Sequence, residues 1–351
     1  MEGAVPVNDK ALAAKLQKVR STEVKRTRAR FSQVVPEHAF SEETLVGIPR
    51  DINEEAVRRL CEHPEFPAMA RRLAQQGAPD KADNGVIAHA LRDGFRLMSG
   101  IWSLYLAATP GGLTFSRFDA LHQVSGEGGR ARTHGLITYL RFLGYIEPDD
   151  SGHDGRERRY RPTARMREAF RRYFTESLEA AVALYPEAAP MIALMEDEQA
   201  FDDFMVSTGE GLMIAGSLVR LHKGPSFNDF SRRKSGMVML WTLLLSAPPS
   251  LEWPTRAPFP VSIADIARKA GVSRAHVQRL LRDCEANGMM ALDGAGNVRV
   301  RRVMWLEINT YQALFVICMG ACARNTLAKR AARDEARLAV SQAAQPSSAT
   351  A

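Results

Sequence analysis

Residues 262–282 read SIADIARKAGVSRAHVQRLLR, and this stretch decides the fold expected for the second half of the chain. Apolar residues recur at helical spacing on both sides of Gly271, which predicts two helices at 263–270 and 274–286. Gly271 can adopt a left-handed backbone without a steric clash, and the small Ala267 lets the two helices approach closely. The stretch therefore predicts two helices that meet at a sharp angle.

The second of these helices has two chemically different faces. Ser273 is a good N-cap for this helix, and Val272 is expected to fill the space between the helices. The inner, apolar face carries Val277, Leu280, Leu281 and Cys284. The outer face carries arginine and glutamine, the side chains best suited to reading guanine and adenine edges in a major groove. The residues expected to contact DNA here are Ser273, Arg274, His276, Gln278, Arg279 and Arg282.

This pattern resembles the helix-turn-helix of bacterial transcription regulators in its small residue, its glycine and its two later apolar positions. Residues 289–303 then read as a hairpin, which would complete a winged helix. Four polar residues would place this wing on phosphates: Asn297, Arg299, Arg301 and Arg302. The resemblance implies binding to double-stranded DNA, and a helical turn used for protein contacts is the alternative.

The segment 113–170 resembles the winged helix of MarR-type regulators. The resemblance rests on TYLRFLGYI at 138–146, like a recognition helix entering a strand, and on DGRERRYRPT at 154–163, like that family's wing. In the family such a wing tip lies in the minor groove, where arginine is favoured. By resemblance, the residues expected to contact DNA in this unit are Arg130, Arg132, Thr133, His134, Thr138, Arg141, Arg156, Arg158 and Arg159.

This first unit departs from the pattern at its turn. Residues 125–129 make a longer and looser turn, and His122 stands where the second unit has the small Ala267. The angle between the two helices is therefore expected to differ. A solvated, arginine-rich face with a wing that does not bind DNA is the alternative interpretation.

The two halves of the chain share one order of elements: a long helix, two short helices, a hairpin and another long helix. Gly126 corresponds to Gly271, and residues 143–145 correspond to 287–289. These landmarks predict an internal duplication with a period of about 145 residues. One chain would then imitate the two-fold symmetry that separate regulator protomers provide.

Composition is that of a globular protein with a basic balance. The 351 residues are 45% hydrophobic and 25% charged, with a formal net charge of +7, which favours a polyanionic partner. The four cysteines form no CxxC pair, which suits a reducing cytoplasm. Cys318 and Cys322 are interpreted as core residues, with a metal or redox pair as the alternative. No signal peptide is expected at the start, and the apolar stretches 237–246 and 314–323 predict buried helices.

Composition and periodicity also predict the boundaries. We divide the chain into a basic arm (1–35), a helical N-terminal segment (36–84), the first winged-helix unit (85–186), a helical and acidic linker (187–231), the second winged-helix unit (232–327) and a disordered tail (328–351). Long helices are predicted at 52–76, 86–107, 164–185 and 306–325, and shorter helices at 115–124, 132–143 and 236–245. The predicted fold class is mainly α with small β wings: two tandem winged-helix units joined by long helices, with pseudo-two-fold symmetry as one way of relating them.

The motifs of common catalytic sites are missing from the sequence. It has no GxxxxGK[ST], no HExxH and no dinucleotide-type glycine fingerprint, so we expect no enzyme, no cofactor and no metal. Residues 207–211 (STGEG) are expected to lie between helices and cap one, with a ligand contact as the alternative. The acidic residues 196–198 and 202–203 are expected to form a solvated helix start or linker, with metal binding as the alternative. A ligand pocket is conceivable among five aromatic residues, but we interpret them as core: Trp102, Tyr105, Phe142, Trp241 and Trp305.

The sequence as a whole favours a cytoplasmic, nucleoid-associated, sequence-specific transcription regulator. Each recognition helix would enter a major groove, with the second unit reading bases and the first anchoring on phosphate or minor groove. The partners considered are double-stranded DNA, a second copy of the chain and a small-molecule effector, but no membrane. The alternatives are a plasmid-type replication initiator and, in another class, a chromosome-organising scaffold that uses winged helices for protein contacts.

Overall fold

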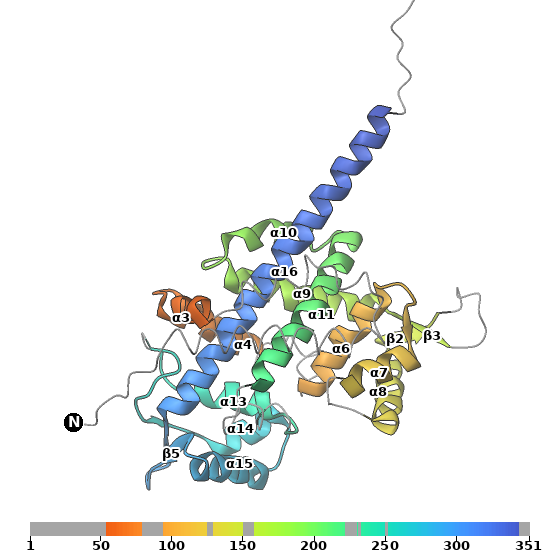
Figure 1. The fold of residues 1–351 in the computed structure, drawn as a ribbon. Helices are drawn as coiled ribbons and strands as arrows, with labels where there is room; N and C mark the ends of the chain where they lie inside the picture. Colours follow the sequence, from red (N-terminus) through yellow and green to blue (C-terminus); the bar gives the residue numbers. More distant parts are fainter. Residues whose placement is uncertain are drawn as a thin grey trace, which may run out of the picture.

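The computed structural model describes residues 54–78, 94–124, 129–149, 158–221, 230, 233–249 and 252–343. The predicted basic arm 1–35, the wing residue Arg156 and the last part of the predicted tail, 344–351, lie outside the described residues. Within them the protein is mainly α-helical and contains two three-stranded antiparallel sheets (Figure 1). The expectation of a mainly α fold with small β elements is therefore confirmed.

The elements follow one another in a simple order. The first part contains α3 (Glu54–Glu62), α4 (Phe66–Gln76), α6 (Gly94–Ala107), β1 (Leu113–Thr114), α7 (Phe115–Val124), α8 (Arg130–Phe142), β2 (Ile146–Pro148), β3 (Arg159–Pro162) and α9 (Ala164–Ala181). The middle contains η3 (Pro186–Ala188), α10 (Ala189–Leu194) and α11 (Glu198–Leu221). The last part contains α13 (Gly236–Leu245), β4 (Phe259–Pro260), α14 (Ile263–Ala270), α15 (Arg274–Ala286), β5 (Met290–Leu292), β6 (Asn297–Val300) and α16 (Arg302–Ala343).

One arrangement of elements occurs twice. From α6 to α9 and from α13 to α16 the order is helix, strand, helix, helix, strand, strand, helix. The sheets have the same strand order, β1-β3-β2 in the first part and β4-β6-β5 in the second. The short first strands were not predicted, because two residues carry no alternating pattern of their own.

The turn from the second short helix into the hairpin is the same in both copies. The amide of Tyr145 donates to the carbonyl of Leu140 at 2.9 Å, and the amide of Met289 donates to that of Cys284 at 2.8 Å. Gly144 and Gly288 follow these helices with φ near +68° and +69°, the left-handed region that favours glycine. These matching hydrogen bonds align Leu140 with Cys284, and they agree with the period predicted from the sequence.

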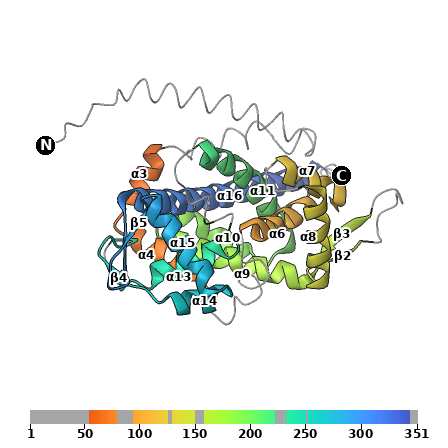
Figure 2. The ribbon, with the colours of Figure 1, turned by 90° about the horizontal axis from the view of Figure 1, so that it is seen from below.

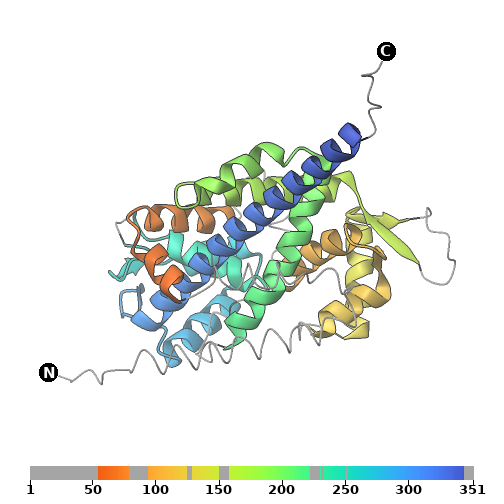
Figure 3. The same cartoon turned by 45° about the horizontal axis from the view of Figure 1, so that its top comes forward.

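The helix α16 holds the two copies in one hydrophobic core. It packs against α3, α9, α10 and α11, and in Figure 3 it runs the length of the body, with α11 alongside. By length and composition its residues 302–340 could span a membrane, but most of its apolar stretch is buried inside the protein. We therefore interpret α16 as a core helix.

The predicted end of this helix and the predicted tail are wrong over residues 328–343. The helix continues to Ala343. As far as Arg333 its charges have partners on the middle of the chain: Lys329 lies 3.8 Å from Glu210, and Arg330 lies 2.8 Å from Asp197. Arg333 also pairs with a carboxylate of α11. A composition rich in Ala, Gln, Ser and Pro suggested disorder, whereas these ion pairs stabilise the first part of this extension.

The prediction that residues 207–211 lie between helices is also wrong. They form the middle of α11, where Ser207 and Thr208 are buried. Gly209 faces Tyr105 so closely that a Cβ atom would lie 2.5 Å from the ring carbon Cδ2. Glycine is therefore required by close packing, not by a cap. The single helix predicted at 52–76 is likewise interrupted, between α3 and α4.

Replacing Gly209 tests this contact. Gly209→Ala should lower the free energy of unfolding by about 1–3 kcal/mol, because the fully buried Tyr105 has no room to yield. Urea unfolding measures the change. Gly135→Ala is the matched control, because nothing lies within 4 Å of its Cβ position and alanine favours a helix. Equal effects of the two substitutions would contradict the close packing of α11 on α6.

A buried carboxyl, that of Glu210, follows Gly209 on α11. Glu210 is 1% exposed, and its Oε2 accepts no hydrogen bond from the described residues. Burial raises the pKa of Glu210 to about 7, although the positive charge of Lys329 opposes the shift. The carboxyl therefore exchanges its proton in the neutral pH range.

This carboxyl makes stability depend on pH. The pKa of Glu210 is about 7 in the folded protein and about 4.3 in an unfolded chain. Between these values the folded state binds the extra proton, so its stability falls as the pH rises. In urea unfolding, Glu210→Gln should show a smaller loss of stability from about pH 5 to about pH 8 than the unchanged protein. Glu179→Gln, at an exposed position of α9, is the control and should keep the full loss; an equal loss in all three proteins would refute the assignment.

Candidate nucleic-acid interface

The pair α14–α15 is shaped by three local interactions. The hydroxyl of Ser262 accepts a hydrogen bond from the amide of Asp265 at 3.2 Å and caps the start of α14. Gly271, with φ of 61°, ends this helix. The amide of Val272 then donates to the carbonyl of Ala267 at 3.0 Å. The hydroxyl of Ser273 accepts the amide of His276 at 3.2 Å and begins α15. The turn residues therefore take the roles that the sequence predicted for them.

The outer face of α15 is polar and open. Its inner residues Val277, Leu280, Leu281 and Cys284 are buried, whereas Ser273, Arg274, Gln278, Arg279 and Arg282 are exposed. Among the described residues, no carboxylate pairs with Arg274 or Arg279. The Nε of Arg282 donates only to the Gln278 carbonyl, at 3.4 Å. This contrasts with α14, where Arg268 pairs with Asp265 at 2.5 Å.

His276 lies at the edge of this face. It is half-buried, and its Nε2 has no hydrogen-bond partner among the described residues. Burial lowers the pKa of His276, and the charges of Arg279, Arg233 and Lys234 lower it further. Arg233 and Lys234 lie beside α15, where Arg233 donates to the carboxylate of Asp283 at 2.9 Å. Sequence reasoning did not single them out, although they belong to a short basic run, RRK, before α13.

Three of the four predicted wing residues are exposed. Arg299 lies on β6, Arg301 just beyond it, and Arg302 is the first residue of α16. Asn297 is half-buried and points into the turn, where its side-chain nitrogen donates to the carboxylate of Asp293 at 2.8 Å. Hydrogen bonds from Asn297 hold the pKa of Asp293 low. The hairpin therefore offers arginines, while Asn297 stabilises its turn.

In the first pair, α7–α8, arginines are held on aromatic rings. The guanidinium of Arg132 lies 3.6 Å from the ring centre of Phe95, and that of Arg130 lies 5.6 Å from the ring centre of Phe115. The exposed residues of α8 predicted to bind DNA are Arg130, Arg132, His134, Thr138 and Arg141. The prediction for Thr133 is wrong, since its side chain is fully buried and faces the core.

His122 stands in the first pair where the second pair has the small Ala267, and it fits there without disrupting the packing of the helices. Its ring is buried, with Nε2 at 2.8 Å from the hydroxyl of Ser99 and Nδ1 at 2.8 Å from the carbonyl of Phe118. Burial lowers the pKa of His122. A small serine on α6 thus makes the room that a small residue makes in the second pair.

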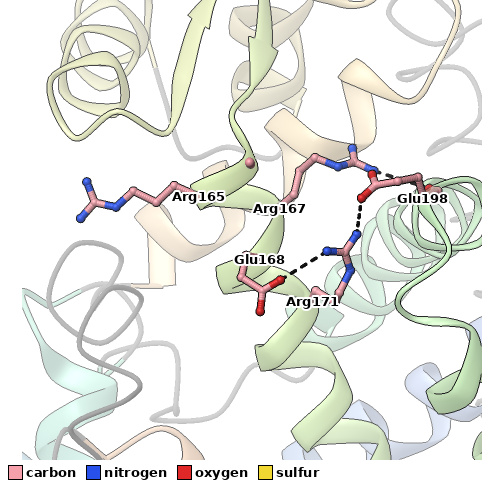
Figure 4. Close-up of a pocket in the computed structure, with 6 residues that line it drawn as sticks. Arg165, Arg167, Glu168, Arg171 and Glu198 are labelled. Carbon is pink, nitrogen blue, oxygen red and sulfur yellow. Dashed lines mark hydrogen bonds and ion pairs between the residues drawn. The ribbon is translucent and has the colours of Figure 1, made fainter.

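The arginines near the first hairpin divide into two groups. Arg158 and Arg159 are exposed at the start of β3. Arg167 and Arg171 instead line a surface hollow of about 650 Å³ and turn toward the carboxylate of Glu198 (Figure 4). Arg171 lies 2.6 Å from Glu198, and its Nε donates to the Met195 carbonyl at 2.6 Å. Arg167 and Arg171 are therefore structural residues.

Acidic residues that were predicted to form a solvated helix start instead form ion pairs with these arginines. Asp202 lies 2.8 Å from Arg167, and Glu198 pairs with both arginines. In the part of the chain that the structure describes, no group of three or more histidine, cysteine or acidic residues could hold a metal ion. Cys318 and Cys322 lie on α16 and are buried in the hydrophobic core, with their sulfur atoms 4.0 Å apart.

The two helix pairs lie far from each other on the protein. Seen from below in Figure 2, α14 and α15 lie toward one end of the body, and α7 and α8 at the other. The core helices α6, α11 and α16 connect them. The structure thus brings the predicted residues together as two separate clusters, one on each pair.

Comparisons with protein-family models, with curated proteins and with solved structures found no match to this chain.

The two groups of arginines differ in what their loss should cost. Arg171→Ala should lower the free energy of unfolding by about 1–3 kcal/mol, because it removes hydrogen bonds to a carboxylate and a buried carbonyl. Arg172→Ala is the control: the next side chain is half-exposed and 4.0 Å from Glu168, so it should cost below about 0.5 kcal/mol. Thermal or urea unfolding distinguishes the two, and equal costs would show that Arg171 has no structural role.

Proposed function

We propose that this protein binds double-stranded DNA through two winged-helix units and acts as a sequence-specific transcription regulator. The observation that carries the proposal is the outer face of α15, where three arginines and a glutamine are exposed on one helix behind a well-formed turn. Arginine and glutamine can each bond two atoms on the edge of guanine and adenine, respectively. An exposed basic face attracts a polyanion, and counterions are released from the phosphates when it binds.

The second unit has the parts needed to read a sequence. The Gly271 turn sets α15 against α14, so that the N-terminal end of α15 is free to enter a major groove. Arg299 and Arg301 on the hairpin are suited to phosphates on either side. Lys234 extends the positive surface, whereas Arg233 is paired with Asp283 of α15.

The first unit is suited to anchoring. The planes of Arg130 and Arg132 rest on phenylalanine rings, which limits the freedom of both side chains before any partner binds. Arginine held in this way loses less entropy when it bonds a phosphate. The repeated order of elements supports two half-sites on one chain, and the different outer faces of α8 and α15 support unlike half-sites.

Selection of duplexes from a random library tests the proposal. The protein should enrich a defined motif, and its affinity should fall as salt rises. Arg274→Ala and Gln278→Ala should each weaken binding to the selected duplex by about 5- to 150-fold, because each removes a base contact. Fluorescence anisotropy at fixed salt measures this loss.

Two results would contradict the proposal. The first is the absence of any salt-sensitive binding to duplex DNA. The second is an equal loss on Arg58→Ala, which removes one exposed arginine from α3, outside both helix pairs. If DNA binding is absent and the protein with both Arg274→Ala and Gln278→Ala keeps its function, the chromosome-organising scaffold is the better interpretation. Genome-wide mapping then separates a regulator, bound at promoters, from a replication initiator, bound at repeats near an origin.

A further inference from the structure

The outer face of α8 differs in kind from that of α15. Phe142, at the C-terminal end of α8, is 85% exposed. It is the most exposed large hydrophobic residue that the structure describes. Ala131, Gly135 and Thr138 lie on the same side of the helix at helical spacing, and all are exposed. The sequence had assigned Phe142 to the core, so that interpretation is wrong.

The hydroxyl hydrogen of Thr138 is already bonded within the helix, which leaves its methyl group as the other part of the side chain. Its Oγ1 donates to the carbonyl of His134 at 3.0 Å, one helical turn back. The hydroxyl is therefore satisfied within the helix. At Gly135 nothing lies within 4 Å of the position that a Cβ would take, so a partner can approach the backbone there. The face consequently offers carbon atoms and close access.

The matching turns at the ends of the two helices allow a comparison position by position. Gly135 and Arg279 each lie ten residues before the last residue of that turn, Tyr145 or Met289. By the same count, Thr138 stands where the second unit has Arg282. Hydrogen-bonding side chains of α15 are thus replaced on α8 by groups without free donors.

Exposed arginines surround this apolar stripe. Arg130 and Arg132 begin the helix, Arg141 ends it, and Arg158 and Arg159 follow on the adjacent hairpin. Such a rim suits phosphate groups on both sides of a groove. The apolar part is one ring and the methyl groups of Ala131 and Thr138, far smaller than the area that a stable protein partner buries. Its counterpart should therefore be small, apolar and framed by phosphates.

The thymine 5-methyl group in a major groove has this chemistry. We propose that α8 recognises thymine through its 5-methyl group, with Thr138 and Phe142 as the contacting residues and Gly135 allowing close approach. This inference rests on the proposed DNA binding and adds its specificity: an A·T-rich half-site beneath α8, beside a half-site read by hydrogen bonds beneath α15.

Uracil substitution tests the inference, because uracil pairs as thymine does but lacks the methyl group. The probes are the duplex selected from the random library and copies of it in which each thymine in turn is replaced by uracil. In one half-site, replacement should weaken binding of the unchanged protein about fourfold per contacted methyl group, the size expected for one buried carbon. Fluorescence anisotropy at fixed salt measures the affinities.

Two variants of Thr138 sharpen the test. Thr138→Ser keeps the hydroxyl and removes the methyl, so it should bind the thymine duplex about fourfold more weakly. It should also become insensitive to uracil at one position. Thr138→Val keeps a methyl in place and should retain the uracil sensitivity. Phe142→Ala should abolish sensitivity at a neighbouring position, and Gln278→Ala, on the other unit, should leave all these sensitivities unchanged.

The outcomes separate the inference from the proposed function. If no duplex is selected, the DNA-binding proposal fails and the thymine contact fails with it. If a duplex binds tightly but no thymine replacement in either half-site matters, only the thymine contact is refuted. It is also refuted if Phe142→Ala retains every uracil sensitivity but changes the molecular mass in solution, because the stripe would then be a contact between protein chains.

Discussion

The packing of α16 against α11 is the contact on which the other elements depend. The strand β6 ends at Val300 and α16 begins at Arg302, so the second hairpin is joined almost directly to the core helix. α11 packs on α16 and also on α6, which leads into the first pair. The packing around α11 includes a glycine against Tyr105 and the buried carboxyl of Glu210. A large apolar surface is buried around both, and this burial stabilises the arrangement.

Local signals were sufficient where a segment carries its own start and stop. The helices predicted at 115–124, 236–245, 263–270 and 274–286 are confirmed to the residue, and serine caps and the Gly271 turn mark the ends of the last two. The predictions failed for α11 and the end of α16, where distant partners decide. The glycines and acidic residues of α11 are typical of a linker, yet Gly209 faces Tyr105 and Glu198 pairs with Arg171.

The candidate site shows the same division. The exposed face of α15 follows from helical periodicity, so its residues could be chosen from the sequence. On α8, Thr133 was predicted to contact DNA but is buried, and Phe142 was predicted to lie in the core but is exposed. Hydrophobicity alone did not determine which residues face inward. The buried roles of Arg167 and Arg171 required knowledge of where Glu198 lies. A count of arginines could not distinguish them from Arg158 and Arg159.

The doubled arrangement within one chain has an evolutionary consequence. In a symmetric pair of identical chains, one substitution changes both binding surfaces together, and the two must remain alike. Here α8 and α15 are encoded separately, so either can change while the other is kept. Phe142 and Gly135 on one helix, against Arg279 and Arg282 on the other, show how different the two outer faces are. Under the proposed DNA binding, a new preference can arise on one face without loss of the existing one on the other.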